Sequence, residues 1–453
     1  MQGYREYAAS QTAWLGDLPS HWECKKIGSL FTERKTKVSD KDYSPLSVTK
    51  MGILPQLKHA AKSNDGDNRK LVCEGDFVIN SRSDRKGSCG VSELDGSVSL
   101  INLILTPRGQ WNNRYAHYLL RSQPFSEEYY RNGRGIVADL WTTRYSEMKS
   151  ILLPVPPREE QDQIVRFLDW KVSSINRLIN IKKNMIELLE NRKKSIINSV
   201  LAGGASNSVC KESVIEGLLT IPTTWDERPL KFYASSNDES LSSKTPSNYE
   251  FNYIDISTTG FRKLKKEPVC TTFEEAPSRA RRIVREGDTI LSTVRTYLKA
   301  ILYIDNTKDG NVVSTGFAVL RPKDGVYPPL LSYALSCDYF INAVIRNSIG
   351  VSYPAINEKK LLSLKLALPK SYDEQVKVYE QIMALTESTD ITIKYLQDMV
   401  NGLQDLKNRL ISDTVTGKID VRGIDIPEYE FVDEDTDADN EDGDEEEIQE
   451  QED

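Results

Sequence analysis

The stretch PREEQDQIVRFLDWKVSSINRLINIKKNMIELLENRKKSIINSVLAGG, Pro157 to Gly204, has the composition of one very long helix. Its apolar residues recur at steps of three, four and seven, the heptad pattern of a helix that packs on another helix. These residues are Leu168, Val172, Ile175, Ile179, Ile186, Leu189, Ile196 and Val200. A compact domain rarely needs so long a helix, so the segment predicts a spacer.

The chain contains the same order of motifs twice, and internal repeats of this kind indicate duplicated structural units. LPSHWECKKI (Leu18–Ile27) returns as IPTTWDERPL (Ile221–Leu230), and EGDFVINS (Glu74–Ser81) returns as EGDTILST (Glu286–Thr293). Further pairs are VTKMG (Val48–Gly52) with STTG (Ser257–Gly260), and Asn132–Pro154 with Asn347–Pro369. We therefore expect two globular domains of one architecture.

Each half ends in a long segment of the same length. Glu160-Gln161 recurs as Glu374-Gln375 and Gly203 as Gly417, both 214 residues further along the chain. Loops tolerate insertions better than packed helices do, so equal length indicates a geometric constraint. The second segment continues the heptad spacing at Ile393, Leu396, Val400, Leu403 and Leu410, while Thr386 and Thr389 weaken it.

Neither long helix can bury a one-sided apolar seam alone. We therefore expect the two to pack on each other as an antiparallel coiled coil. The alternative is that each helix docks on its own globular domain. About 40 helical residues span on the order of 60 Å, enough to hold two domains apart.

The segments before the long helices combine strands and short helices. Short apolar runs bounded by Gly, Asp and Pro indicate strands, for example FVINS (Phe77–Ser81) and TILSTV (Thr289–Val294). Short helices are expected at residues 115–132 and 330–347. The fold class is therefore α+β, with two mixed α/β domains separated by two long helices. The predicted parts are a first domain (1–156), a first long helix (157–204), a second domain (205–370), a second long helix with its C-terminal end (371–422) and an acidic tail (423–453).

The formal net charge of −8 averages two different segments. Of the 67 acidic side chains, 17 lie in residues 423–453, and no Lys or Arg follows Arg422. Residues 1–422 therefore carry 59 basic and 50 acidic side chains, a net charge of +9. A basic body is typical of a protein that binds a polyanion, although ordinary solubility charge gives the same balance. The tail is expected to be a disordered, solvating run.

Several protein classes are argued against by what the chain lacks. It has no run of eighteen apolar residues and no signal-peptide pattern at its N-terminus, so we expect a cytoplasmic protein that does not cross a membrane. Its six cysteines form no C-x-x-C pair and its three histidines show no metal-ligand spacing, which argues against disulfide frameworks and zinc sites. Because no G-x-x-x-x-G-K-[ST] loop is present, this chain is not expected to hydrolyse ATP.

Taken together, these motifs resemble the DNA-specificity (S) subunits of type I restriction-modification systems. The resemblance rests on the duplicated layout, the LP..W opening of each half, and the exit strands that lead into EEQ (159–161) or DEQ (373–375). The closing segment LKNRLISDTVTGKID (Leu406–Asp420) is also similar to the family's terminal helix. The resemblance extends to about Val421, and the acidic tail departs from it.

The resemblance implies two target-recognition domains, each reading one half of an asymmetric bipartite site in double-stranded DNA. It implies long helices that set the gap between half-sites and dock two methylation subunits, which transfer a methyl group from S-adenosylmethionine to adenine N6. Restriction subunits would join to cut DNA with ATP and Mg²⁺. No cofactor is expected in this chain, which lacks the Asn-Pro-Pro-aromatic signature of the methylation partner. We therefore expect a noncatalytic subunit.

Sequence-specific reading needs side chains that offer donors and acceptors to base edges, chiefly Arg, Lys, Asn and Gln. Three loop regions recur at equivalent places in the two halves and supply candidates. In the first half these are Thr49, Lys50, Asn80, Arg82, Arg85, Lys86, Arg131 and Arg134. In the second they are Thr258, Arg262, Lys263, Ser292, Thr293, Arg295, Tyr297, Arg346, Asn347, Ser352 and Tyr353. For each one, a solvated charge or a phosphate contact is the alternative to a base contact.

A denser basic cluster, SRARRIVREGD (Ser278–Asp288), predicts contact with the DNA backbone, or else the exposed face of a short helix. The acidic tail either only solvates the chain or competes with DNA for its basic body.

Two other function classes are alternatives to a DNA-recognition subunit. A methyltransferase or nuclease acting alone is disfavoured by the missing motifs. An architectural coiled-coil scaffold without DNA specificity is the remaining alternative. A swap of residues 1–150 discriminates it, because only a DNA reader would change its sequence preference.

Overall fold

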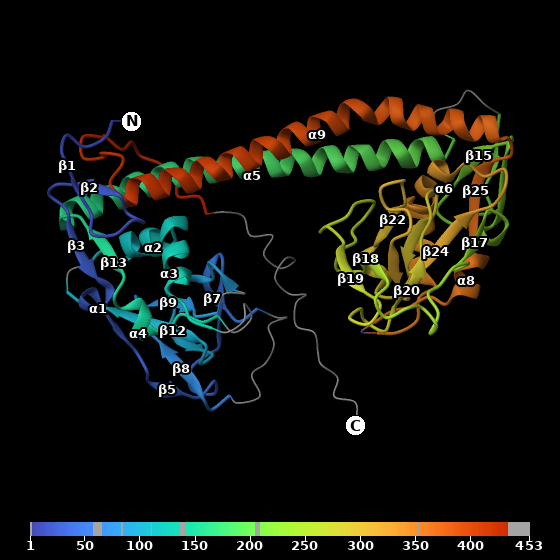
Figure 1. The fold of residues 1–453 in the computed structure, drawn as a ribbon. Coiled ribbons are helices and arrows are strands. Elements are labelled where there is room, and N and C mark those ends of the chain that lie inside the picture. The colour runs from blue at the N-terminus through green and yellow to red at the C-terminus, as the bar shows by residue number, and fades with distance from the viewer. Residues whose placement is uncertain are drawn as a thin grey trace. The chain divides into compact units, whose positions relative to one another are not determined.

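Figure 1 shows the fold in a computed structural model of the chain, which describes residues 2–57, 66–82, 85–109, 111–135, 141–203, 209–351 and 353–433. The chain forms two compact units. Unit 1 comprises Met1–Met185 and Leu396–Asp453, and unit 2 comprises Ile186–Tyr395. Each unit therefore contains one globular domain and a part of each long helix.

The two long helices are α5 (Arg158–Leu201) and α9 (Tyr372–Val415), each 44 residues long. Both carry two acidic residues in the first turn, which suits the positive end of the helix dipole. The residues predicted to form the apolar seams are all buried or half-buried. The prediction of two long helices is confirmed.

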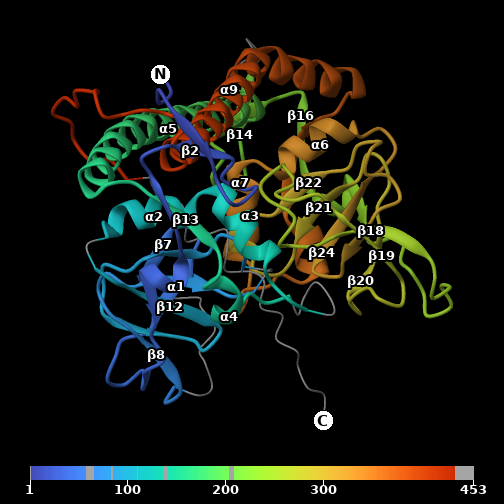
Figure 2. The same ribbon diagram turned by 60° about the vertical axis from the view of Figure 1, so that its left-hand side comes forward.

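The helices α5 and α9 lie side by side and run antiparallel (Figures 1 and 2). In unit 1, Nζ of Lys407 donates to Oδ1 of Asn176 at 3.3 Å. In unit 2, Lys193 forms an ion pair with Asp390 at 2.5 Å. Residues early in α5 therefore lie beside residues late in α9, and the reverse, as predicted.

The polar residues of the α9 seam are accommodated rather than excluded. Thr386 is fully buried, and its hydroxyl donates to the carbonyl of Ile382 at 2.8 Å. A threonine that bonds back to the preceding turn can be buried in a helix without an unpaired hydroxyl. The alternative of docking on the domains also holds in part, because Phe167 and Leu168 of α5 share a core with Tyr115 and Leu119 of the first domain.

The first domain is built around one antiparallel sheet of order β10-β9-β12-β4. Its central strand β9 (Phe77–Asn80) is buried along its whole length and pairs with β12 (Asn102–Pro107). The outer strands are β10 (Cys89–Val91) and β4 (Phe31–Glu33). The other strands are β1 (Tyr7–Ala9), β2 (Asp17–Pro19), β3 (Glu23–Lys26), β5 (Lys37–Val38), β6 (Leu46–Thr49), β7 (Gly52–Pro55), β8 (Arg69–Val72), β11 (Gly96–Val98) and β13 (Leu152–Val155). The short helices are α1 (Ile27–Leu30), α2 (Asn113–Arg121), α3 (Gln123–Arg131) and α4 (Tyr145–Met148).

The second domain repeats this plan with the sheet β17-β24-β21-β22. Its central strands are β21 (Thr289–Ser292) and β24 (Phe317–Pro322), flanked by β22 (Ile301–Tyr303) and β17 (Ala234–Ser236). A second sheet of order β19-β18-β23-β20 consists of β18 (Glu250–Ile254), β19 (Val269–Thr272), β20 (Ala280–Ile283) and β23 (Val312–Ser314). The remaining elements are β14 (Cys210–Glu212), β15 (Thr220–Pro222), β16 (Trp225–Pro229), β25 (Lys365–Pro369), η3 (Leu230–Phe232), η4 (Thr296–Leu298), α6 (Pro328–Leu335), α7 (Asp338–Arg346) and α8 (Glu358–Ser363). The predicted short helices are thus confirmed as the pairs α2 with α3 and α6 with α7.

The repeated Glu-Gln pair fastens α5 to the first domain. Oε1 of Gln161 accepts from the backbone N–H of Asn112 at 3.0 Å, and its Nε2 donates to the carbonyl of Pro156 at 2.9 Å. Nε1 of Trp22 donates to Oε1 of Glu160 at 3.0 Å. The tryptophan and Glu-Gln motifs of the sequence therefore meet at the start of the long helix.

The same fastening recurs in unit 2. Oε1 of Gln375 accepts from the backbone N–H of Tyr327 at 2.7 Å, and Nε1 of Trp225 donates to Glu374 at 3.2 Å. Because a buried amide or carboxylate needs its hydrogen bonds, the two motifs are held together in both copies. Their recurrence is structural.

Candidate nucleic-acid interface

Two of the predicted loops in the first domain are joined by backbone bridges. Thr142 bridges to Arg82, which follows β9, and also to Arg134, which follows α3. The N–H of Arg134 donates to the carbonyl of Thr142 at 3.0 Å, and the reverse bond has the same length. Residues from two distant parts of the sequence thus form one surface, which we name the unit 1 bridge (Arg82, Arg134 and Thr142).

The third predicted loop is the turn between β6 and β7. It lies beside the hairpin formed by β9 and β10. A Cβ atom on Gly90 of β10 would lie 3.1 Å from the Cα of Gly52 in that turn. Nη2 of Arg121 on α2 donates to the carbonyl of Lys50 at 2.5 Å. This turn therefore lies beside β10, the strand that follows the loop of Arg82, and beside α2.

The candidate side chains of unit 1 divide into two kinds. Thr49 and Asn80 shape their own loops, because Oγ1 of Thr49 donates to the carbonyl of Gly52 at 3.1 Å and Oδ1 of Asn80 accepts from the N–H of Arg82 at 3.0 Å. Arg85 is half-buried, and its carbonyl accepts from the hydroxyl of Tyr130 at 3.3 Å. The exposed cations are Lys50, Arg82, Lys86, Arg131 and Arg134.

Two of these exposed arginines stand beside carboxylates. Arg131 pairs with Glu128 of its own helix. Arg134 lies 3.9 Å from Glu147, yet 84% of its side chain is exposed. Both arginine side chains are at least 64% exposed although Glu128 and Glu147 are largely buried, so each guanidinium group is accessible to another anion.

The second domain contains the same arrangement with different residues. Ala355 bridges to Val294, which follows β21, and to Ile349, which follows α7. The N–H of Ile349 donates to the carbonyl of Ala355 at 2.8 Å, and the reverse bond measures 2.9 Å. We name this set the unit 2 bridge (Val294, Ile349 and Ala355). Its positions correspond to Arg82, Arg134 and Thr142.

Most hydroxyl candidates of unit 2 donate to carbonyl groups within unit 2. Oγ1 of Thr258 donates to the carbonyl of Asp255 at 2.9 Å, and Ser292 and Thr293 donate to Val294 and Gly316 at 2.6 and 2.8 Å. Nδ2 of Asn347 likewise donates to a carbonyl of α7. These groups hold the loops in shape, while Ser352 lies outside the described residues.

Arg262 is half-buried, and its guanidinium is engaged by neighbouring groups of its own domain. Its guanidinium donates to the carbonyl of Ser332 at 3.0 Å and to Oγ of Ser336 at 2.9 Å, and it stacks on the ring of Tyr333 at 3.7 Å. Burial lowers its pKa. The neighbouring Lys263 is exposed and lies 3.6 Å from Glu190.

The remaining candidates of unit 2 lie at the surface. Arg295 stands over the ring of Tyr353 at 4.9 Å, and the rings of Tyr297 and Tyr353 are 51% and 65% exposed. Arg346 lies 3.2 Å from Glu216. Unit 2 therefore presents more aromatic and fewer basic groups than unit 1 at its bridge.

The alternative of a short helix at the basic cluster Ser278–Asp288 was wrong. The central residues of the cluster form the strand β20 and not a short helix, because Ala280 and Ile283 pair with β23. Arg285 pairs with Glu239 at 2.6 Å. Hydrogen bonds from Arg285 and Arg321 lower the pKa of Glu239 to about 2.

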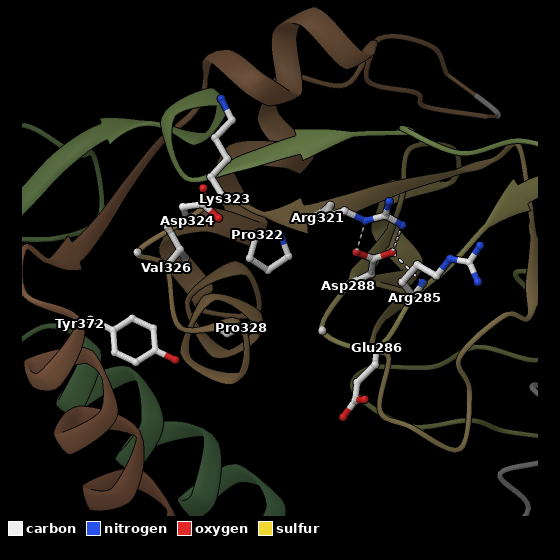
Figure 3. Close-up of a pocket in the computed structure, with 12 residues that line it drawn as sticks. Arg285, Glu286, Asp288, Arg321, Pro322, Lys323, Asp324, Val326, Pro328 and Tyr372 are labelled. Atoms are coloured by element: carbon white, nitrogen blue, oxygen red, sulfur yellow. Dashed lines mark hydrogen bonds and ion pairs between the residues drawn. The ribbon is translucent and has the colours of Figure 1, made fainter.

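Figure 3 shows a pocket of about 490 Å³ beside this cluster. Arg321 turns toward Asp288, with Nε and Nη2 donating at 2.9 and 2.8 Å. The charges of Arg321 and Asp288 satisfy each other, while the exposed Lys323 also lines the pocket. Contact of the cluster with a DNA backbone stays a prediction.

The structure also assigns a role to the repeated Glu-Gly-Asp motif, which sequence reasoning left unused. Asp76 and Asp288 are each 1% exposed. Asp76 accepts from Nε of Arg34 at 2.8 Å, and the equivalent Asp288 accepts from Nε of Arg321 at 2.9 Å. The recurrence of an aspartate directly before a buried strand was the signal that could have found this pair.

Across the residues that the structure describes, no group of His, Cys, Asp and Glu side chains could hold a metal ion. No helix in this part of the chain is long and apolar enough to cross a bilayer.

One family model and several known proteins are similar to this chain in sequence. Residues 224–398 match the family model of the type I restriction modification DNA specificity domain. The MjaVIII specificity subunit of a type I restriction enzyme from Methanocaldococcus jannaschii is 25% identical over 61% of this chain, and the match spans 64% of that subunit. The putative MjaX specificity subunit from the same organism is 23% identical over 93% of this chain and 99% of its own length.

One solved structure supports the fold. A chain from a structure of complex assembly and conformational transition of the type I R-M system aligns with 89% of this chain and 99% of its own. The TM-score is 0.55 and the identity is 16%.

Proposed function

We propose that this chain, like the type I restriction enzyme specificity subunits to which it is similar, reads a bipartite DNA site, one half-site with each globular domain. The observation that carries the proposal is the pair of bridges. The same backbone arrangement holds Arg82 and Arg134 in unit 1 and Val294 and Ile349 in unit 2. A constant scaffold with different side chains is what two readers of different half-sites require.

The contacts to DNA are proposed for the side chains that are exposed. In unit 1 these are Lys50, Arg82, Lys86, Arg131 and Arg134, and in unit 2 they are Lys263, Tyr297, Arg346 and Tyr353, joined by Arg295, which is half-buried. Arginine can bond to two acceptors of guanine in the major groove, and both arginine and lysine can neutralise phosphates. The candidates that hydrogen-bond within their own domain are proposed to shape the reading loops. These are Thr49, Asn80, Thr258, Arg262, Ser292, Thr293 and Asn347.

We further propose that α5 and α9 dock two methylation subunits. Along α5, Leu178, Ile181, Met185 and Leu188 are spaced three or four residues apart and are at least 40% exposed. This spacing places them on one helix face, and a solvent-exposed apolar stripe of this kind favours a partner helix. The methylation subunits would supply S-adenosylmethionine chemistry, and restriction subunits would supply ATP- and Mg²⁺-dependent cleavage.

In this proposal the chain itself is noncatalytic. It acts in the cytoplasm, the compartment in which it meets host DNA. The experiment that tests the proposal is methylation profiling of the host genome with the gene present and deleted. Loss of one bipartite N6-methyladenine motif on deletion is expected. An unchanged methylome, together with failure to co-purify with a methylation subunit, would contradict the proposal.

A domain swap separates the proposal from an architectural scaffold. Replacing residues 1–150 by the corresponding domain of another family member should change one half of the methylated motif and leave the other half intact. If only assembly changes and the motif stays the same, the scaffold function is the better account.

A further inference from the structure

The loops around the unit 2 bridge present an apolar surface where unit 1 presents arginines. Five apolar or aromatic side chains are exposed there, and we name them the apolar tip: Tyr297, Leu298, Ile349, Val351 and Tyr353. Ile349 is 82% exposed and Val351 is fully exposed. Aliphatic side chains that are this fully exposed to water favour burial against a partner.

The backbone holds these side chains outward. Gly350 has a φ of +121°, and a Cβ atom on it would lie 2.9 Å from the carbonyl oxygen of Tyr353. Only glycine suits this tight turn, which places Ile349 and Val351 on either side of it. The hydroxyl of Thr296 donates to Oγ of Ser348 at 2.8 Å, so the two loops of the tip are joined.

Cations flank the apolar tip. Arg295 and Lys299 both have left-handed backbone conformations, with φ values of 49° and 53°, at the two ends of η4. Arg295 stands over the ring of Tyr353 at 4.9 Å. Positive groups beside an apolar centre are complementary to a duplex, whose phosphates border a groove that carries the methyl groups of thymine.

We propose that the second domain recognises its half-site by apolar contact with thymine methyl groups in the major groove. A comparison of equivalent positions in the two bridges supports thymine methyl groups as the contacted groups. Where Arg134 of unit 1 presents a donor fork suited to guanine, the equivalent Ile349 can offer only van der Waals contact. The inference rests on the proposed function and specifies the chemistry of one of its two half-sites.

The test uses the full complex of this chain with its methylation subunits and a duplex carrying the methylated motif, with half-sites assigned by the domain swap. Every thymine of the second half-site is replaced by deoxyuridine, which lacks only the methyl group. The Kd should rise about four-fold for each contacted methyl, the factor for returning one methylene-sized group to water. The same replacement in the first half-site should change the Kd by less than about two-fold, because arginine contacts do not use the methyl.

A variant connects the effect to the apolar tip. The complex with Ile349→Ser and Val351→Ser should bind the thymine and deoxyuridine duplexes alike. Both side chains are exposed, so the fold should tolerate the change. The control Val269→Ser, at a 64% exposed position on β19, should keep the full difference between the two duplexes.

The outcomes are distinct. Sequence-specific binding that is indifferent to deoxyuridine in the second half-site would overturn the inference and leave the proposed function standing. A complex with no bipartite sequence preference at all would overturn the proposed function, and the inference with it.

Discussion

A single buried carboxylate organises the start of the central strand in each domain. Oδ2 of Asp76 accepts from the N–H of Cys73 at 2.9 Å, and Oδ2 of Asp288 accepts from the N–H of Arg285 at 2.8 Å. The charge of Asp76 is met by Arg34, which follows β4, whereas Asp288 is met by Arg321 on β24. The two copies thus keep the carboxylate and supply its cation from different strands.

The adjacent residues Arg262 and Lys263 should behave differently when truncated. Arg262→Ala removes the hydrogen bonds to Ser332 and Ser336, so we expect unit 2 to lose about 1.5–3 kcal/mol of stability, the range for hydrogen bonds to a charged group. Lys263→Ala, at a side chain that is 65% exposed, should cost less than about 0.5 kcal/mol. Hydrogen exchange of α6 measures both, and equal effects of the two substitutions would contradict the assignment.

His117 should make unit 1 sensitive to mild acid. Burial, with Arg121 and Arg114 nearby, lowers its pKa well below the usual value. Nδ1 of its ring accepts from the N–H of Val91 at 3.3 Å, and Nε2 lies 2.7 Å from Nη1 of Arg121, a cation that opposes protonation of the ring. A histidine whose folded-state pKa is depressed stabilises the fold above its unfolded value near 6.5, and that stability is lost as the pH falls below it.

The measurement is thermal unfolding of the wild type and His117→Gln between pH 7.5 and 5.5. We expect the wild type to lose about 1 kcal/mol more than the variant over the lowest pH unit, because one additional proton binds on unfolding. Parallel loss in both proteins would show that other groups, and not His117, set the acid sensitivity.

The candidate site was predictable as a set of loops and not as a set of contacts. The repeats located the segments that carry Arg82, Arg134 and Ile349, because equivalent motifs fold alike. Nothing in the order of residues distinguishes Arg262, which is half-buried and hydrogen-bonded to α6, from Lys263, which is exposed. That difference depends on the packing of α6 beneath the loop, and tertiary contacts of this kind lie outside local sequence patterns.

At the scale of elements, the long helices were the most predictable part of the fold. Their heptad spacing extends over many turns, and such extended periodicity is a strong signal. The reason for their equal length was less visible. It lies in Gln161 and Gln375, whose amides fix where each helix begins relative to its domain.

Matched insertions into both helices should lengthen the gap between the two half-sites. Seven residues added after Asn191 in α5, with seven added after Ile391 in α9, keep the heptad phase beside the pair Lys193 and Asp390. Seven helical residues add about 10 Å, or roughly three base pairs at about 3.4 Å each. Methylation profiling should find both half-sites unchanged and the unread gap longer by three.

The insertion into α5 alone is the control for this experiment. It displaces one apolar seam from the other, so we expect weaker assembly and a lower melting temperature instead of a clean change in the gap. A paired insertion that leaves the gap unchanged while both half-sites persist would remove the spacer role from the helices.

At the scale of the whole molecule, the chain after α9 is tied to unit 1 as far as the described residues extend. Nε2 of Gln163 donates to the carbonyl of Ile424 at 2.9 Å, Arg177 pairs with Glu430 at 2.8 Å, and Nδ2 of Asn176 donates to Val432 at 3.1 Å. This segment, residues 421–433, follows α5. Residues 423–433 belong to the predicted disordered tail (423–453) but contact α5, and the rest of that tail, after Asp433, lies outside the described residues.

Truncation after Asp433 therefore tests the acidic tail without removing contacts to α5. Residues 434–453 contain thirteen Asp or Glu and no Lys or Arg, so their removal changes the formal net charge from −8 to +5. If the tail competes with DNA for the basic body, the truncated complex should bind non-target DNA several-fold more tightly at about 50 mM salt. Its affinity should also fall more steeply with rising salt, because more phosphate counterions are released on binding.

A tail of the same length made of Gly and Ser separates charge from bulk. It should behave like the truncation if the acidic side chains compete with DNA, since it keeps the chain and loses the charge. It should behave like the wild type if length alone matters. Unchanged affinity for non-target DNA in both variants would leave the tail as a solvating segment, and the basic body would then meet DNA without an internal competitor.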